Sequence, residues 1–166
     1  LKQRIICKLI IEDGVLVKYK RFTESRRVVG NPVSTLRVLS DQVLDEFMLC
    51  FLGVADPALV RAMTETIHTP VSVAGSIHTM EHVDELIRKC GVDRVVIRHP
   101  TLVTAVAKKY GAQAVVWPVD YTGDIGKYRV SLSAASVSTA SVGEVLLTSI
   151  DRDGMSSGFD LAALSY

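Results

Sequence analysis

The sequence predicts an α/β fold with a mainly parallel sheet, and three observations lead to this prediction. Short runs rich in β-branched residues recur along the chain, and amphipathic segments of helical period lie between several of them. The run Val145–Leu147 is continuous and apolar, as expected of a parallel strand covered on both faces. With 166 residues the chain is long enough for one domain with a substantial core. We therefore expect a single α/β domain over residues 1–166.

The expected strands are short apolar runs, several of which begin with a charged residue. In chain order they are Arg4–Ile11, Phe47–Leu52, Val71–Ala74, Arg94–Arg98, Ala114–Asp120 and Glu144–Ile150. Pro118 falls inside one of them, where it removes a hydrogen bond of the ladder. Alternation with period two places Lys8 on the same face as Arg4, toward the interior of a closed sheet.

The expected helices are recognised by their apolar stripes and their ends. Asn31 precedes a proline at the first helical position, and Gly91 and Gly111 follow two amphipathic segments as stop signals. We expect helices at Asn31–Leu44, Pro57–Ile67, Thr79–Cys90 and Thr101–Tyr110.

Two hairpin-like insertions interrupt the alternation of strands and helices. One spans Glu12–Phe22 around Asp13-Gly14, and the other spans Asp120–Ser133 around Gly123 and Gly126. The stretch Ser131–Ser141 is a run of Ser, Ala and Thr without a clear apolar stripe. We expect a loop there, where a crossover helix would ordinarily lie.

Composition excludes several classes of function. The net charge of +1 gives no surface for a polyanion, so we expect no nucleic-acid partner, and no apolar run approaches the length of a membrane span. Three widely spaced cysteines without a CxxC pair indicate reduced thiols in a cytoplasmic protein. His78 and His82 are four residues apart but no third ligand is evident. We therefore expect no metal and no cofactor.

Five motifs point to a family. They are RII..L..EDG at the start, VSVAGSI (71–77), VDRVVIR (92–98), YGAQAVVWPVD (110–120) and GEVLLTSIDRDG (143–154) followed by SSGFDLAAL. In this order they resemble the cyclase subunit of imidazole glycerol phosphate synthase, an enzyme of histidine biosynthesis. The resemblance implies a (β/α)8 barrel of the TIM type. It also implies a lyase-type cyclase that takes ammonia from a class-I glutaminase partner and acts on a phosphorylated small molecule.

The expected barrel is incomplete. A (β/α)8 barrel takes about 250 residues, and this chain offers six expected strands. We expect either that segments are absent from the sequence or that the chain pairs with another copy.

The resemblance assigns the chemistry to the carboxyl ends of the strands. Asp120 matches one of the family's two acid/base aspartates, whereas the other position is Ile10, which cannot transfer a proton. Lys18 matches the active-site lysine. The expected phosphate- or substrate-binding residues are Gly75, Ser76, Arg98, Thr148, Asp153 and Gly154, with a helix N-terminus expected after the last of them.

The other end of the strands matches the family more fully. Four charged residues at strand starts match the ring through which ammonia enters, and they are Arg4, Glu46, Arg94 and Glu144. Asp45 and Asp93 match residues on the rim that faces the glutaminase.

Two alternatives stay open at this point. An aliphatic residue at position 10 also occurs in relatives that accept ammonia for amidation of an acetamido sugar in surface-polysaccharide biosynthesis. The other alternative is a non-catalytic barrel fragment that binds a phosphate or a partner. Cys50 is expected in the core.

Overall fold

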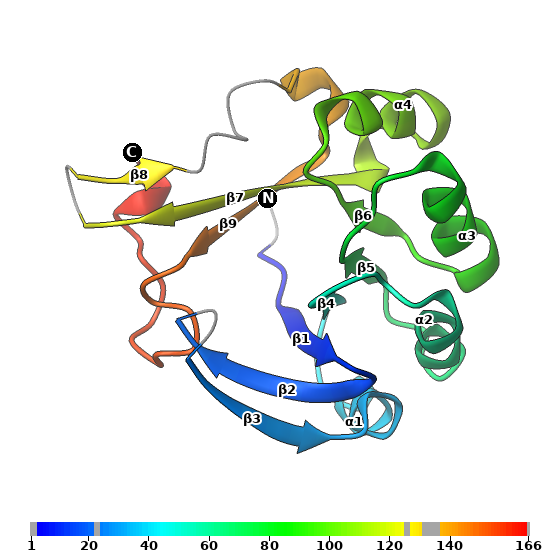
Figure 1. Ribbon diagram of the computed structural model, residues 1–166, viewed down its shortest axis with the longest axis horizontal. Coiled ribbons are helices and arrows are strands. Elements are labelled where there is room, and N and C mark those ends of the chain that lie inside the picture. Colours follow the sequence, from blue (N-terminus) through cyan, green and yellow to red (C-terminus); the bar gives the residue numbers. More distant parts are fainter. Residues whose placement is uncertain (1–2, 22–23, 125–126, 131–136, 166) are drawn as a thin grey trace.

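The protein is a curved, mostly parallel sheet with helices on its outer side (Figure 1). This computed structural model describes residues 3–21, 24–124, 127–130 and 137–165. The strands are β1 (Ile6–Glu12), β2 (Val15–Lys20), β3 (Glu24–Gly30), β4 (Glu46–Phe51), β5 (Val71–Ala74), β6 (Arg94–Val96), β7 (Val115–Thr122), β8 (Arg129–Val130) and β9 (Glu144–Ser149). The α-helices are α1 (Pro32–Ser40), α2 (Pro57–Thr64), α3 (Met80–Cys90) and α4 (Pro100–Tyr110). Short 3-10 helices occur at Ala112–Ala114, Thr139–Ser141 and Ala163–Ser165.

The parallel strands β1, β4, β5, β6, β7 and β9 lie side by side in chain order. Neighbouring strands are staggered: Ile10 near the end of β1 lies beside Cys50, and the same row runs through Ala74, Val96 and Val116 to Glu144 at the start of β9. This stagger is the geometry by which a sheet curves toward a barrel. Among the described residues β9 does not pair with β1, so the barrel is not closed. The α/β class and the incomplete barrel are as expected.

The helices cover the outer face because that face carries the apolar residues of each strand. Asn31 caps α1 by accepting a hydrogen bond from the Ser34 amide, and Gly91 ends α3 in the left-handed conformation with φ 69°. The expected helix ends at these two positions are confirmed. The main core contains fully buried residues of helices and strands alike, among them Leu36, Val60, Val83, Leu86, Val103, Leu49, Val73, Val95 and Val115.

The concave face of the sheet is apolar in its middle. Met48, Val96 and Val116 form a second, smaller cluster there, with Cys50 and Leu146 against it. Along the strands, one group of charged residues lies before this apolar cluster and another group lies after it. The concave face therefore has a polar region at each of its two ends.

The first hairpin is longer than expected. The turn at Asp13-Gly14 leads into β2, as expected, and β2 then pairs with a further antiparallel strand, β3. Sequence reasoning missed β3 because its sequence, ESRRVVG, has no buried residue and so lacks the expected alternation. The second hairpin is present as β7 paired with β8, while its turn at Gly126 and most of the expected loop, residues 131–136, lie outside the described residues.

Pro118 lies where the pairing of β6 with β7 ends. The Ile97 amide still donates to the Val116 carbonyl at 3.1 Å. The next bond of that ladder would need the N–H that proline lacks. On its other side β7 pairs with β9 along its length, so the proline ends one ladder and leaves the other intact.

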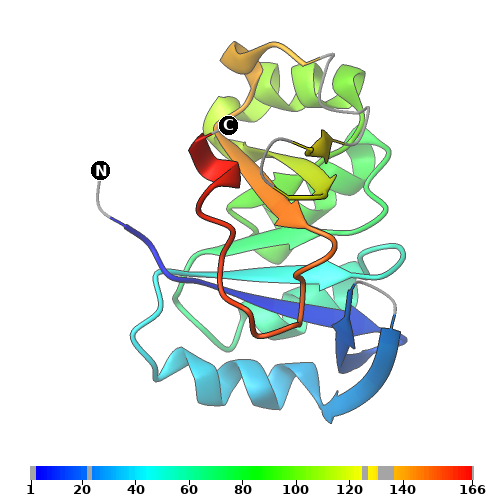
Figure 2. The same ribbon diagram turned by 90° about the vertical axis from the view of Figure 1, so that its left-hand side faces the viewer.

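Strand β9 is less covered than its neighbours. Val145 is 62% exposed and Leu147 is 36% exposed on the outer face. Between β8 and β9 the described residues contain only the 3-10 turn Thr139–Ser141 in place of a crossover helix. After β9 the chain runs along the open side of the sheet (Figure 2), with Phe159 92% exposed. No helix in the described part of the chain is long and apolar enough to cross a membrane.

Candidate functional site

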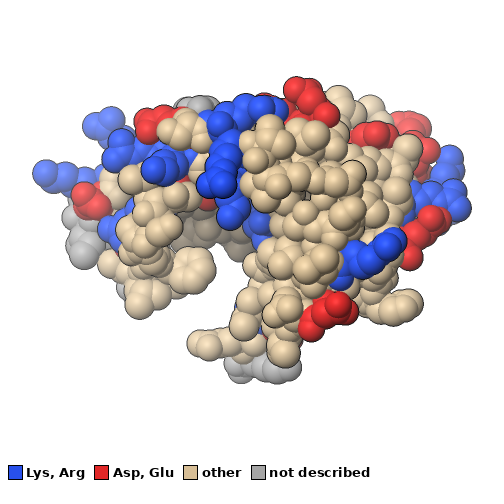
Figure 3. All heavy atoms as spheres, turned by 90° about the horizontal axis from the view of Figure 1, so that it is seen from below, with Lys and Arg blue, Asp and Glu red and all other residues tan. Residues whose placement is uncertain are grey.

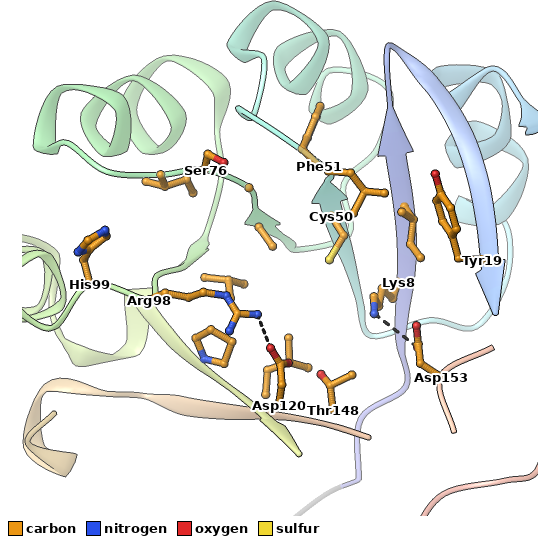
Figure 4. A pocket seen from close by; sticks show the side chains of 18 of the residues that line it. Lys8, Tyr19, Cys50, Phe51, Ser76, Arg98, His99, Asp120, Thr148 and Asp153 are labelled. Carbon is orange, nitrogen blue, oxygen red and sulfur yellow. Dashed lines mark ion pairs between the residues drawn. The ribbon is translucent and has the colours of Figure 1, made fainter. Parts of the chain in front are cut away.

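A cavity of about 420 Å³ opens at the carboxyl ends of the parallel strands. It gathers residues from β1, β5, β6, β7 and β9 that are far apart in sequence (Figure 4). The expected site residues that line it are Gly75, Ser76, Arg98, Asp120, Thr148 and Asp153. The carboxyl ends of parallel strands are where α/β proteins hold ligands, so this cavity is the candidate site.

Asp120 and Arg98 face one another across neighbouring strand ends. The Arg98 guanidinium Nη2 lies 2.8 Å from Asp120 Oδ2. The side chain of Asp120 is 14% exposed and that of Arg98 is 53% exposed. The two side chains meet because β6 and β7 are adjacent and parallel, with Val96 beside Val116, so each strand ends at the same edge.

Lys8 enters the cavity from β1, as the alternation predicts. Its Nζ lies 3.7 Å from Asp153 Oδ1, in the turn after β9. The ammonium, on a side chain that is 30% exposed, is therefore neutralised by Asp153, whereas the sequence suggested Asp120 or a bound anion. The cavity thus contains two cations, Lys8 and Arg98, each beside a carboxylate (Figure 4).

The hairpin turns Tyr19 toward the cavity and Lys18 away from it. Ile10 and Tyr19 line the cavity, and Lys18 does not. Lys18 instead lies opposite Arg27 on the exposed β2–β3 ribbon, where basic side chains gather (Figure 3). The register of the hairpin, which sequence reasoning could not fix, decides which of the two neighbours faces inward.

Tyr19 is held by two charged groups. Its hydroxyl donates to Glu12 Oε1 at 2.9 Å, and Arg26 pairs with the same carboxylate. The hydrogen bonds from Arg26 and then Tyr19 lower the pKa of the Glu12 carboxyl. Desolvation, followed by the bond to Glu12, raises the pKa of the Tyr19 phenol. Tyr19 therefore borders the cavity as a neutral hydroxyl.

Gly75 packs tightly against the backbone of two neighbouring residues. A Cβ at this position would lie 3.0 Å from the Ala55 nitrogen and 3.1 Å from the Gly53 carbonyl oxygen. The Ser76 amide donates to that same Gly53 carbonyl at 2.7 Å. The Ser76 hydroxyl, rather than its amide, is therefore the group that this turn offers to a ligand.

The turn Asp151–Gly154 joins three parts of the structure. Asp151 accepts a hydrogen bond from the Gly123 amide at 2.8 Å, in the β7–β8 turn. Arg152 lies 3.7 Å from Asp160 in the C-terminal segment. The Asp153 side chain pairs with Lys8, and the Asp153 backbone carbonyl accepts a hydrogen bond from the Arg21 amide at 2.8 Å. This turn therefore fixes the end of β9 against the rest of the sheet.

Gly154 lines a second, adjacent cavity of about 490 Å³ between β9 and the C-terminal segment. It has φ +70°, and a Cβ there would lie 2.2 Å from the Tyr19 carbonyl oxygen. The close approach of the hairpin thus accounts for the glycine. The expected helix N-terminus after this turn is wrong, since residues 155–162 form turns and bends.

At the opposite end of the strands the four expected ring charges meet. Glu46 is 2% exposed and accepts from Arg4 at 3.0 Å and from Arg94 at 2.5 Å. Glu144 also pairs with Arg4, and it lies 3.4 Å from Arg94. Each carboxylate thus contacts both guanidinium groups, and the cluster bridges β1, β4, β6 and β9 across the open barrel.

Asp45 and Asp93 bind neighbouring strands. Asp45 Oδ2 accepts the Ile5 amide at 2.8 Å, and Asp93 Oδ2 accepts the Val71 amide at 2.9 Å. Each carboxylate satisfies a backbone donor at the start of the adjacent strand. This structural role suffices to account for both residues, and their role at a partner surface stays a prediction.

Two cavity residues, Cys50 and His78, were assigned otherwise from the sequence. Cys50, expected in the core, lines the cavity, and burial raises the pKa of its thiol. The alternation that starts at Glu46 would have placed it on the concave face. His78 and His99 also line the cavity, with ring centroids 5.1 Å apart. No sequence signal pairs these two histidines, because they follow different strands.

The spacing of His78 and His82 does not produce a metal site. His82 Nε2 lies 2.9 Å from the Ala55 carbonyl oxygen, whereas His78 contacts His99. Within the described residues no group of three His, Cys, Asp or Glu side chains is arranged to hold a metal ion.

Comparison with known proteins gives full-length matches along this chain. A protein-family model described as "Histidine biosynthesis protein" matches residues 4–166. The chain is 34% identical to the imidazole glycerol phosphate synthase subunit HisF of Myxococcus xanthus, over 98% of this chain and 73% of that protein. It is likewise 34% identical to the HisF subunit of Thermotoga sp. strain RQ2, over 100% of this chain and 74% of that protein.

A third relative has a related name. The putative imidazole glycerol phosphate synthase subunit hisF2 of Pseudomonas aeruginosa is 28% identical over 97% of this chain and 73% of that protein.

The alignment with the Myxococcus protein spans 187 positions, which is more than the 166 residues of this chain. The relative therefore contains internal segments that this chain lacks, in agreement with the uncovered outer face of β9. The chain belongs to the histidine biosynthesis protein family.

Proposed function

We propose that this chain is the cyclase-type subunit of a synthase that uses ammonia from a class-I glutaminase, like the imidazole glycerol phosphate synthase of histidine biosynthesis. One observation carries the proposal: a single concave face has a cluster of four charges at one end and a cavity with acidic and basic groups at the other. The reaction class that fits is a lyase-type ring closure on a phosphorylated substrate.

The charged cluster would admit ammonia. Arg4, Glu46, Arg94 and Glu144 stand at the strand starts, where a glutaminase subunit would dock beside Asp45 and Asp93. Beyond the cluster the concave face is lined by Met48, Val96 and Val116. An apolar passage favours neutral ammonia over the ammonium ion, because the charged form pays a larger desolvation cost.

The cavity would perform the chemistry. Of the family's two acid/base aspartates this chain retains one, Asp120, which would transfer the proton. Ile10 stands at the other position and supplies only an apolar side chain to the cavity wall. Arg98 and Ser76 would bind a phosphate-type anion with N–H and O–H donors, and Thr148, which lies beside Asp120 in Figure 4, would contact another part of the substrate. Lys8, which lines the cavity, would supply the cation that the sequence assigned to Lys18.

An Asp120→Asn variant separates an enzyme from a binding protein. The assay supplies ammonium chloride and a phosphorylated ribotide and measures release of an imidazole product. We expect turnover to fall by about 100-fold or more, since a proton-transfer group contributes about that factor. The matched control is Glu65→Gln, which breaks another 2.8 Å arginine–carboxylate pair, that with Arg61 on α2. Absence of turnover in the unmodified protein would favour the non-catalytic alternative; the comparisons give no support to the acetamido-sugar alternative.

A further inference from the structure

Arg98 and Asp120 have proposed roles that compete with one another in the observed arrangement. The Arg98 guanidinium contacts Asp120 Oδ2 at 2.8 Å. In Figure 4 its side chain extends toward Asp120 and away from Ser76. An anion held at the Ser76 end of the cavity would need the positive charge of Arg98, which now lies at the other end.

Proton transfer by Asp120 has the opposite requirement. The guanidinium engages Asp120 Oδ2 at 2.8 Å, so this oxygen is occupied and only Oδ1 is left to exchange a proton with a substrate. The second cation of the cavity does not relieve this conflict, because Lys8 lies beside Asp153 at 3.7 Å. In the observed arrangement both cations of the cavity are therefore paired with its own carboxylates.

We propose that Arg98 is a positioning residue that couples anion binding to Asp120: an anion in the cavity draws the guanidinium away and releases the carboxylate for proton transfer. The inference rests on the proposed function, since it assumes that Arg98 binds the anion and that Asp120 transfers the proton. It adds that the two events are linked, so that a substrate without its anionic group leaves Asp120 engaged.

The energetics of the pair permit such an exchange. Arg98 is 53% exposed, and ion pairs with so much solvent access are weak. A phosphate carries about two negative charges near neutral pH and accepts several hydrogen bonds, so it competes well with a single carboxylate. A ligand shifts such an equilibrium by its difference in affinity for the two arrangements. An anion that binds only the displaced Arg98 meets this condition.

The test is isothermal titration calorimetry with inorganic phosphate as the probe. Unmodified protein is compared with Asp120→Asn, Arg98→Gln, the double variant and the control Glu65→Gln. We expect Asp120→Asn to bind phosphate about threefold to fivefold more tightly, because the competing carboxylate is lost. Arg98→Gln and the double variant should bind equally weakly, and Glu65→Gln should match the unmodified protein.

The outcomes distinguish two failures. If Arg98→Gln binds phosphate as well as the unmodified protein, or if neither binds it, the anion site of the proposed function is refuted and the coupling with it. If binding depends on Arg98 but Asp120→Asn binds no more tightly, the coupling alone is refuted. A measurement without any Asp120 variant checks the result: the carboxyl 13C resonance of Asp120 must shift as phosphate is added, and an unchanged resonance overturns the coupling.

Discussion

Replacing Glu46 by glutamine removes the buried charge that holds the cluster at the strand starts together. Glu46 is 2% exposed and accepts hydrogen bonds from Arg4 and Arg94. Removing one partner of a buried ion pair costs about 3–5 kcal/mol. Arg4 and Arg94 are 34% and 23% exposed and keep Glu144 as a partner. We therefore expect the free energy of unfolding to fall by about 2–3 kcal/mol, below that range.

The assay is urea unfolding at neutral pH, followed by the fluorescence of Trp117, the only tryptophan of the sequence, which is 4% exposed. Glu144→Gln is the matched control: it removes the same charge from the same cluster at a side chain that is 31% exposed. We expect it to cost less than about 1 kcal/mol. Equal losses in the two variants, or a loss below about 1 kcal/mol for Glu46→Gln, would refute the reasoning from burial.

Three further substitutions test other parts of the structure by the same unfolding assay. Gly154→Ala should cost about 2 kcal/mol or more, because φ is +70° and its Cβ would lie 2.2 Å from the Tyr19 carbonyl oxygen. Arg27→Glu should stabilise the hairpin by about 0.5 kcal/mol, since residue 27 lies directly opposite Lys18. Asp84 has its pKa lowered from 3.8 by hydrogen bonds from a lysine and a tyrosine of α4. The contribution of Asp84 to stability is fully present above that value and is lost as pH falls through the lowered pKa of the folded state, so the stability difference between unmodified protein and Asp84→Asn should shrink as pH falls below 3.8.

Each of these substitutions has a control. Gly14→Ala tests the left-handed conformation alone, because φ is +75° and nothing lies within 4 Å of its Cβ. Equal losses at both glycines would contradict the close approach to Tyr19. Arg37→Glu on α1 makes the same change in net charge at a site away from Lys18. An equal gain in the free energy of unfolding for this variant would mean that net charge, and not the contact with Lys18, causes the effect. For Asp84, a difference from Asp84→Asn that persists unchanged at pH 3 would contradict the assigned hydrogen bonds.

Much of the fold could be predicted because burial and periodicity act locally. The run EVLLTS and the stop signal at Gly91 specify β9 and the end of α3 without any distant contact. The strand β3 could not be predicted, since its ESRRVVG sequence is exposed and is held by pairing with β2. β propensity is a weak predictor of a strand that is stabilised only by pairing with the edge of a neighbouring strand.

The candidate site was predicted through the resemblance more than through local chemistry. Alternation alone places Lys8 on the inner face of β1, and the apolar run before Asp120 places that residue at a strand end, but neither pattern can say that Asp153 pairs with Lys8. That pairing depends on how the turn after β9 meets β1 in an open barrel. The choice between Lys18 and Tyr19 likewise depends on hairpin register, which a polar ribbon specifies weakly.

In the proposed function, this concave face receives ammonia from a glutaminase and uses it at the cavity. The direct measurement is the rate of glutamine hydrolysis by a purified class-I glutaminase with and without this chain, in the presence of a phosphorylated ribotide. We expect the chain to accelerate hydrolysis, and we expect Arg98→Gln, which lacks the anion-binding charge, to lose the acceleration. A hydrolysis rate that is unchanged by the unmodified chain would contradict it.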